Sequence, residues 1–109
     1  MKRLPAVATV QIDNDRVKVT QWVFPPGGET GWHRHAMDYV VVPQSTGSLL
    51  LESQGAASIS SLQAGVAYAR PAGIEHNVIN PGEGEFVFVE IELKPPQTSA
   101  GMAAPGEPS

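Results

Sequence analysis

Apolar and polar side chains alternate with a period of two through most of this chain. The clearest run, residues 17–24, reads Val-Lys-Val-Thr-Gln-Trp-Val-Phe and is rich in β-branched and aromatic residues. Such alternation is typical of a β-strand with one buried face, and no window of helical length carries an apolar stripe. The sequence therefore predicts an all-β protein.

Short segments of this kind recur along the chain, and glycine- or proline-rich turns separate most of them. The predicted strands cover residues 6–12, 17–24, 32–35, 39–42, 48–53, 57–62, 66–70, 76–80 and 85–93. Many short strands divided by such turns indicate a β-sandwich or a β-barrel, and the pattern alone does not choose between them.

Length and composition limit the organisation. A chain of 109 residues with 41% hydrophobic residues can build one modest core but not two. We expect a single domain over residues 1–94. Residues 95–109 are rich in proline, glycine and small side chains, which cannot bury enough apolar area to offset their ordering entropy, so we expect a flexible C-terminal tail.

The charge pattern argues against several classes of partner. Lys and Arg number 7 against 11 Asp and Glu, a net charge of −4, and the basic residues are scattered, so nucleic acid is not expected to bind. No apolar run approaches the roughly 20 residues that span a bilayer, so no membrane partner is expected, and we predict a soluble, cytoplasmic protein. Since the chain has no cysteine, any metal ion must be held by nitrogen and oxygen atoms.

The chain has three histidines, at positions 33, 35 and 76. His33 and His35 are two residues apart on a predicted strand, so their side chains share one face, and His76 from a separate strand can complete three sides of a metal ion. A packed or surface role is the alternative for each histidine taken alone. Three imidazole nitrogens suit iron, zinc, nickel or copper and accept manganese, so we predict one divalent transition metal.

The spacing around these histidines resembles the two sequence motifs of the cupin family. The second cupin motif is matched at every defined position, by Gly65, Pro71, Gly73, His76 and Asn80. The first is matched at Gly27, His33, His35 and Gly47 but lacks its glutamate. Residues 32–43 also resemble small bacterial cupins labelled as β-alanine degradation proteins. The resemblance implies a double-stranded β-helix (jelly-roll) barrel, a small-molecule ligand and a homodimer.

The carboxylate of the first motif is the contested position. The family spacing places it at Tyr39 or Val40, neither of which can replace it, and Asp38 lies one residue earlier. If the link between the two strands is one residue shorter here, Asp38 takes that place as a ligand or beside the ligands. A turn-forming role for Asp38 is the alternative.

The fold does not decide the reaction, because cupins include dioxygenases, isomerases, decarboxylases and storage or sensor proteins. The three-histidine set most resembles cupin dioxygenases that act on small chelating substrates. We therefore expect an iron-dependent oxygenase of a small organic acid or dicarbonyl-like compound. A cupin that binds metal or ligand without turnover, and a zinc- or manganese-dependent lyase or isomerase, remain alternatives.

Other polar and aromatic residues carry weaker predictions. Residues near the motifs can orient a substrate or simply line a strand face: Tyr39, Tyr68, Arg70, Glu75 and Asn77. The aromatic residues expected in the core or barrel wall are Trp22, Phe24, Trp32, Phe86 and Phe88. Glu90 and Glu92 alternate with Val89, Ile91 and Leu93, a pattern that predicts a solvated strand face without a chemical role.

Overall fold

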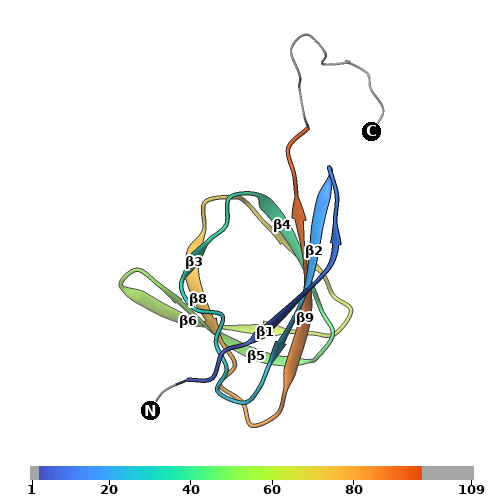
Figure 1. Cartoon of the computed structure of the whole chain (residues 1–109). Helices are drawn as coiled ribbons and strands as arrows, with labels where there is room; N and C mark the ends of the chain where they lie inside the picture. Colours follow the sequence, from blue (N-terminus) through green and yellow to red (C-terminus); the bar gives the residue numbers. More distant parts are fainter. Residues whose placement is uncertain (1–2, 97–109) are drawn as a thin grey trace.

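The computed structural model describes residues 3–96 and consists of β-strands joined by short turns (Figure 1). The strands are β1 (Val7–Asp13), β2 (Val17–Phe24), β3 (His33–Arg34), β4 (Asp38–Pro43), β5 (Gly47–Ser53), β6 (Ala56–Leu62), β7 (Tyr68–Arg70), β8 (Glu75–Ile79) and β9 (Phe86–Leu93). No helix that could span a membrane occurs among these described residues. Of the predicted tail, residues 97–109 lie outside the described part of the chain.

Two antiparallel sheets form the walls of a barrel (Figure 1). One sheet has five strands in the order β1-β2-β9-β4-β7, and the other has four in the order β3-β8-β5-β6. Strands distant in the sequence therefore become neighbours, as in the pairing of β2 with β9 and of β3 with β8. The predicted all-β jelly-roll barrel is confirmed.

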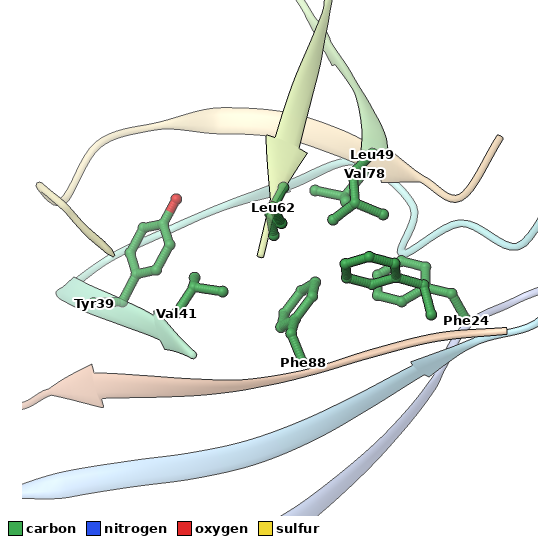
Figure 2. Close-up of a cluster of buried hydrophobic side chains, with 8 residues drawn as sticks. Phe24, Tyr39, Val41, Leu49, Leu62, Val78 and Phe88 are labelled. Atoms are coloured by element: carbon green, nitrogen blue, oxygen red, sulfur yellow. The ribbon is translucent and has the colours of Figure 1, made fainter. Parts of the chain in front are cut away.

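The core lies between the sheets, where side chains from both walls meet (Figure 2). Its buried members are Phe24, Tyr39, Val41, Leu49, Leu62, Val78, Phe86 and Phe88. The expectation that Trp32 lies in the core or barrel wall is wrong, because Trp32 is 55% exposed. The short strand β3 begins only at His33, so Trp32 precedes it in the loop and is not enclosed between the sheets.

Register shows which side chains of the five-stranded sheet point inward. Residues paired across neighbouring strands share one face of a sheet. Glu90 on β9 pairs with Thr20 on β2 and Val41 on β4, and all three are buried. The alternate positions form an outer face that is mostly aliphatic. The outer rows run Val19–Ile91–Val40 and Gln21–Val89–Val42.

Candidate metal centre

The three histidines converge on one point of the barrel interior. His33 on β3 and His76 on β8 are paired in register, and His35 follows two residues after His33. The Nε2 atom of His35 lies 3.0 Å from Nε2 of His33 and 3.2 Å from Nε2 of His76. The structure thus brings together the three histidines selected from the sequence.

Hydrogen bonding orients the His33 ring toward this point. Its Nδ1 atom lies 2.9 Å from the carbonyl oxygen of Gly31. A carbonyl oxygen can only accept, so Nδ1 carries the proton and donates it, and the lone pair of the neutral ring is left on Nε2. This arrangement directs a metal-binding nitrogen at the other two rings.

Burial keeps the other two rings neutral. Burial, followed by the nearby imidazoles of His33 and His76, lowers the pKa of His35 to about 4. Burial and then His33 lower the pKa of His76 to about 4 as well. Near neutral pH both rings therefore lack a positive charge, which is the protonation state that binds a metal ion.

The donor set fits a first-row transition metal. Nitrogen atoms about 2.1 Å from an ion lie about 3.0 Å apart at right angles and about 3.4 Å apart in a tetrahedron. The observed separations of 3.0 and 3.2 Å fall within this range. All three ligands come from one side, so a metal held here would keep open positions for other ligands.

A tight turn before β8 supports His35. Gly73 has a φ angle of 102°, a left-handed conformation that glycine adopts readily. Its amide donates to the carbonyl oxygen of His35 at 2.8 Å, and the His35 amide donates to the carbonyl oxygen of Ile74 at 2.9 Å. Gly73 therefore forms the turn that delivers β8 to the site.

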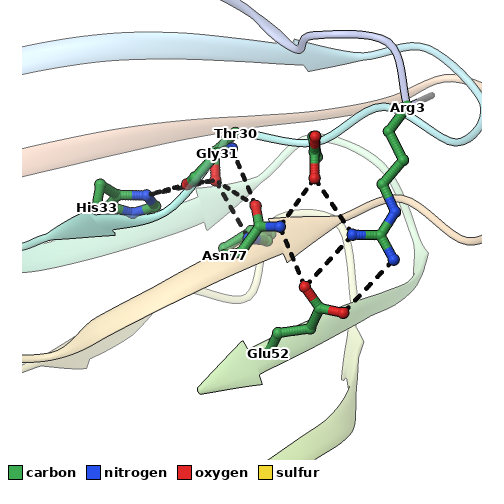
Figure 3. A network of polar contacts seen from close by, with 8 residues as sticks. Arg3, Thr30, Gly31, His33, Glu52 and Asn77 are labelled. Atoms are coloured by element: carbon green, nitrogen blue, oxygen red, sulfur yellow. Dashed lines mark hydrogen bonds and ion pairs between the residues drawn. The ribbon is translucent and has the colours of Figure 1, made fainter. Parts of the chain in front are cut away.

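Asn77 braces the loop that orients His33 (Figure 3). Its side chain is 2% exposed, and its Oδ1 atom accepts a hydrogen bond of 2.9 Å from the amide of Gly31. Its Nδ2 atom donates to the carboxylates of Glu29 at 2.8 Å and Glu52 at 3.2 Å. Asn77 therefore acts on the site through the peptide that holds His33, and it does not line the cavity.

Arg3 completes this network on the outside (Figure 3). Its guanidinium bridges the Glu29 and Glu52 carboxylates at 3.2 and 3.3 Å. The hydrogen bond from Asn77 and then that from Arg3 lower the pKa of Glu29, so its carboxylate stays ionised. The N-terminal segment is thereby tied to the loop that carries the histidines.

Asp38 lies outside the histidine group. Its side chain is exposed, and its Oδ1 atom accepts a hydrogen bond of 2.8 Å from the amide of Ala72. The expectation that Asp38 is a ligand or lies beside the ligands is thus wrong: its carboxylate holds the turn before β8 and does not turn inward. No turn of its own is formed, because Asp38 is the first residue of β4. The inward position belongs to the next residue, Tyr39, which stacks on His35 with ring centroids 3.8 Å apart.

A cavity of about 220 Å³ opens beside the three histidines. Its walls include the apolar side chains of Leu49, Leu51, Ile74, Val78 and Phe88. Tyr39, Tyr68, Arg70 and Glu75, all named from the sequence, also line it. The Arg70 guanidinium lies 4.6 Å from the centre of the Tyr68 ring and is the cationic group of this wall. The space suits a small ligand, and its walls offer polar groups of both signs, Arg70 as well as Glu75 and Glu90.

Glu90 is the site residue that the sequence interpretation missed. It is 8% exposed, lines the cavity and places Oε2 3.9 Å from Nε2 of His35. Burial, followed by the charge of Glu92, raises the pKa of Glu90 to about 7. Glu90 was predicted to face solvent because the residues that alternate with it are apolar, but those apolar residues form the outer face of the sheet. The position of Phe86 and Phe88, with the same parity, was the signal for an inward Glu90.

Asn80, the last residue of the second motif, organises the opposite end of β8. It is 2% exposed, and its Nδ2 atom donates to the carbonyl oxygens of Gly84 at 2.8 Å and of Phe24 at 3.3 Å. Its Oδ1 atom accepts from the amide of Gly82 at 3.0 Å. These bonds close the turn before β9 and give Asn80 a structural role.

A known protein is similar in sequence to most of this chain. No family model matches the sequence. The β-alanine degradation protein BauB of Pseudomonas aeruginosa is 58% identical over 92 residues, which cover 84% of this chain and 97% of that protein.

Solved structures give the same result. A crystal structure of a cupin domain from Bordetella pertussis is 68% identical, with a TM-score of 0.86 over 87% of this chain and 99% of that one. A cupin superfamily protein from Desulfitobacterium hafniense shares the fold at 17% identity, with a TM-score of 0.65 over 87% and 83% of the two chains. The chain therefore belongs to the cupin family.

Proposed function

We propose that this cupin is an iron-dependent oxygenase of a small organic acid. The convergence of three imidazole nitrogens beside a small cavity is the observation that carries the proposal. A redox-active iron bound there would mediate the transfer of electrons from the organic substrate to dioxygen. Both oxygen atoms enter the substrate, so the reaction needs no external reductant.

Arg70 gives the proposed substrate its class. Its guanidinium can bind a carboxylate through paired hydrogen bonds, while its contact with the Tyr68 ring restrains the side chain. The apolar walls opposite exclude water and accommodate a short carbon skeleton. A cavity of about 220 Å³ has room for a compact molecule only.

The similarity to BauB supports the same class. Its name assigns that relative to β-alanine degradation, and β-alanine is a small carboxylate. We propose that this chain acts on a compound of similar size that carries a carboxylate and a second oxygen able to chelate the metal.

Oxygen consumption tests this proposal. Protein loaded with Fe(II) without air is mixed with a panel of short carboxylic acids, and oxygen uptake and product are measured together. We expect one molecule of O2 to be consumed for each molecule of substrate converted. Arg70→Gln should raise KM more than it lowers kcat, because it removes a binding contact. Substrate conversion without oxygen uptake would contradict the oxygenase, and binding without conversion would indicate a ligand-binding cupin.

A second candidate is a lyase or isomerase with bound zinc or manganese. The observation that favours it is Glu90, a cavity carboxyl group with a pKa of about 7, which is suited to proton transfer near neutral pH. Turnover with zinc, in the absence of oxygen, would support this reaction over the oxygenase.

We also propose that the protein is a homodimer that packs through the outer face of the five-stranded sheet. The rows Val19–Ile91–Val40 and Gln21–Val89–Val42 on this face carry no charge. At its edge, Val7 is 57% and Ile12 47% exposed. The charge on this face lies at its end, at Asp38, so its aliphatic centre can pack against the matching surface of a second copy.

A further inference from the structure

The three histidines leave a divalent ion without a negative ligand. Neutral imidazoles donate lone pairs but do not balance a charge of +2, and a charge inside a protein is costly unless it is paired. The first cupin motif would supply a glutamate here, but Tyr39 fills the inward position and Asp38 points to solvent. A carboxylate from elsewhere in the barrel would remove this imbalance.

Glu90 is a buried carboxyl group without a cation in its row of the sheet. Its neighbours in register are Thr20 on β2 and Val41 on β4, and Val41 pairs in turn with Tyr68 on β7. The indole of Trp22 offers it a hydrogen bond but no charge. The His35 ring lies close to Glu90, with Nε2 3.9 Å from the Oε2 atom of the carboxylate.

Glu92 provides the contrast two residues along the same strand. It shares its row with Lys18 on β2, and with Tyr39 and Arg70 on β4 and β7. Glu92 thus has cationic neighbours and does not line the cavity, whereas Glu90 lines the cavity and has none in its row. Lys18 also acts on Glu90, though less than burial and Glu92 do, and the ligand atoms of His35, Glu90 and Glu92 lie within 4.8 Å of one another. Of the two carboxylates, Glu90 is the one that also lines the cavity.

A small rotation of the Glu90 side chain would bring its carboxylate to the distance expected between two ligands of one metal ion. Its Oε2 atom lies 3.9 Å from Nε2 of His35, about 1 Å beyond the separation of adjacent ligands on one ion. Glutamate has three side-chain torsions, and the cavity beside it leaves room for rotation. The carboxylate approaches from the sheet opposite the one that contains His33 and His76.

We propose that Glu90 is the carboxylate ligand of this metal site, in place of the glutamate missing from the first cupin motif. The inference rests on metal binding by the three histidines. It implies a ligand set of three histidines and one glutamate, in which the glutamate is supplied by β9.

Cobalt(II) titration of the metal-free protein tests the assignment. Calorimetry gives the Kd, and the visible absorption of bound cobalt reports a change in its ligands. Glu90→Gln keeps the shape of the side chain and removes its charge. We expect it to weaken cobalt binding by at least about tenfold and to alter the absorption spectrum. Glu85→Gln, at an exposed glutamate immediately before β9, is the matched control and should retain the wild-type Kd and spectrum.

The outcomes separate this inference from the metal site itself. Wild-type Kd and spectrum in Glu90→Gln would overturn the role of Glu90 and leave the three-histidine site standing. No cobalt binding by the wild-type protein would overturn both. The melting temperature of metal-free Glu90→Gln, expected at or above that of wild type, shows whether the variant folds. Glu90→Asp, which keeps the charge on a shorter side chain, should bind cobalt with intermediate affinity, and binding as weak as that of Glu90→Gln would count against a ligand role.

Discussion

At the scale of single residues, the environment of each histidine explains why the cluster is available to a metal ion. Burial holds the pKa values of His35 and His76 at about 4, and the Gly31 carbonyl oxygen holds the proton of His33 on Nδ1. His35 and His76 therefore present lone pairs near neutral pH, and the hydrogen bond to Gly31 turns Nε2 of His33 toward them.

These pKa values predict how the stability of the metal-free protein depends on pH. In the unfolded chain both histidines take up protons near pH 6.5, but in the folded protein they do so only near pH 4. The unfolded state binds more protons in this window, so the free energy of unfolding should fall as the pH is lowered from 6.5 toward 4.

Glu90 has the opposite effect on stability, because its pKa is raised from 4.5 to about 7 and the folded protein binds the extra proton in this range. Glu90→Gln should therefore make the free energy of unfolding fall more steeply as the pH is lowered. Urea unfolding at several pH values, in the presence of a chelator, measures both effects. A free energy of unfolding that is constant from pH 6.5 to 5 would contradict this account.

The contrast between Asp38 and His76 gives a second prediction. His76→Ala should lose most metal because it removes a converging nitrogen, while Asp38→Ala should keep the wild-type Kd because its side chain is exposed. Calorimetric titration with zinc measures both variants. Weaker zinc binding by Asp38→Ala, with an unchanged melting temperature, would show that Asp38 contributes to the metal site.

The sequence predicted the three histidines because fixed motif spacings select them. It did not place the carboxylates correctly, since their direction depends on one residue of strand phase. A shift of one position moves a side chain to the other face of the sheet. Asp38 was predicted to face the site, but Tyr39 is the residue that does. Glu90 was predicted to face solvent, although Phe88, two residues earlier on the same strand, is buried.

At the scale of strands, β8 connects the site to the rest of the barrel. It carries His76 at one end, Asn77 beside it and Val78 in the core. The strand positions followed from alternation and turn residues, but the short β3 was predicted one residue too long at each end. Only tertiary pairing limits β3, so its bounds could not be found in local sequence.

Asn77 offers a prediction at this scale. Asn77→Ala removes a buried amide and leaves the Gly31 amide without its acceptor, so the free energy of unfolding should fall by about 1–3 kcal/mol. Metal affinity should also fall by about tenfold, because His33 loses the support of its loop. Chemical unfolding and metal titration measure these changes.

Glu52→Gln is the control for Asn77. It changes the half-buried end of the same network but keeps an acceptor for the Asn77 amide, and we expect a loss below about 1 kcal/mol with unchanged metal affinity. Equal metal affinity in Asn77→Ala and wild type would show that the loop holds His33 without this network.

At the scale of the whole molecule, the barrel has an apolar outer face that the sequence interpretation assigned to the interior. The aliphatic residues of β9 alternate with Phe86, Phe88 and Glu90, and register places them outside with their partners on β2 and β4. Alternation reveals two faces of a strand but not which face is enclosed, and here both faces are largely apolar.

Light scattering after size-exclusion chromatography tests the proposed dimer. The wild-type protein should have twice the 11.5 kDa mass of one chain. Val89→Lys places a charge within the outer face and should give a monomer. Ile59→Lys, at an exposed position of the other sheet, should remain a dimer. A monomeric wild-type protein would contradict the proposal.

The central claim is that His33, His35 and His76 hold one transition metal ion. The most direct test is elemental analysis by plasma mass spectrometry of the protein purified without a polyhistidine tag, with His33→Ala and His76→Ala prepared in parallel. We predict close to one metal ion per wild-type chain, with iron the main metal, and loss of most of it in both variants. A wild-type protein that holds no transition metal, even after reconstitution with iron, zinc or manganese, would contradict the account.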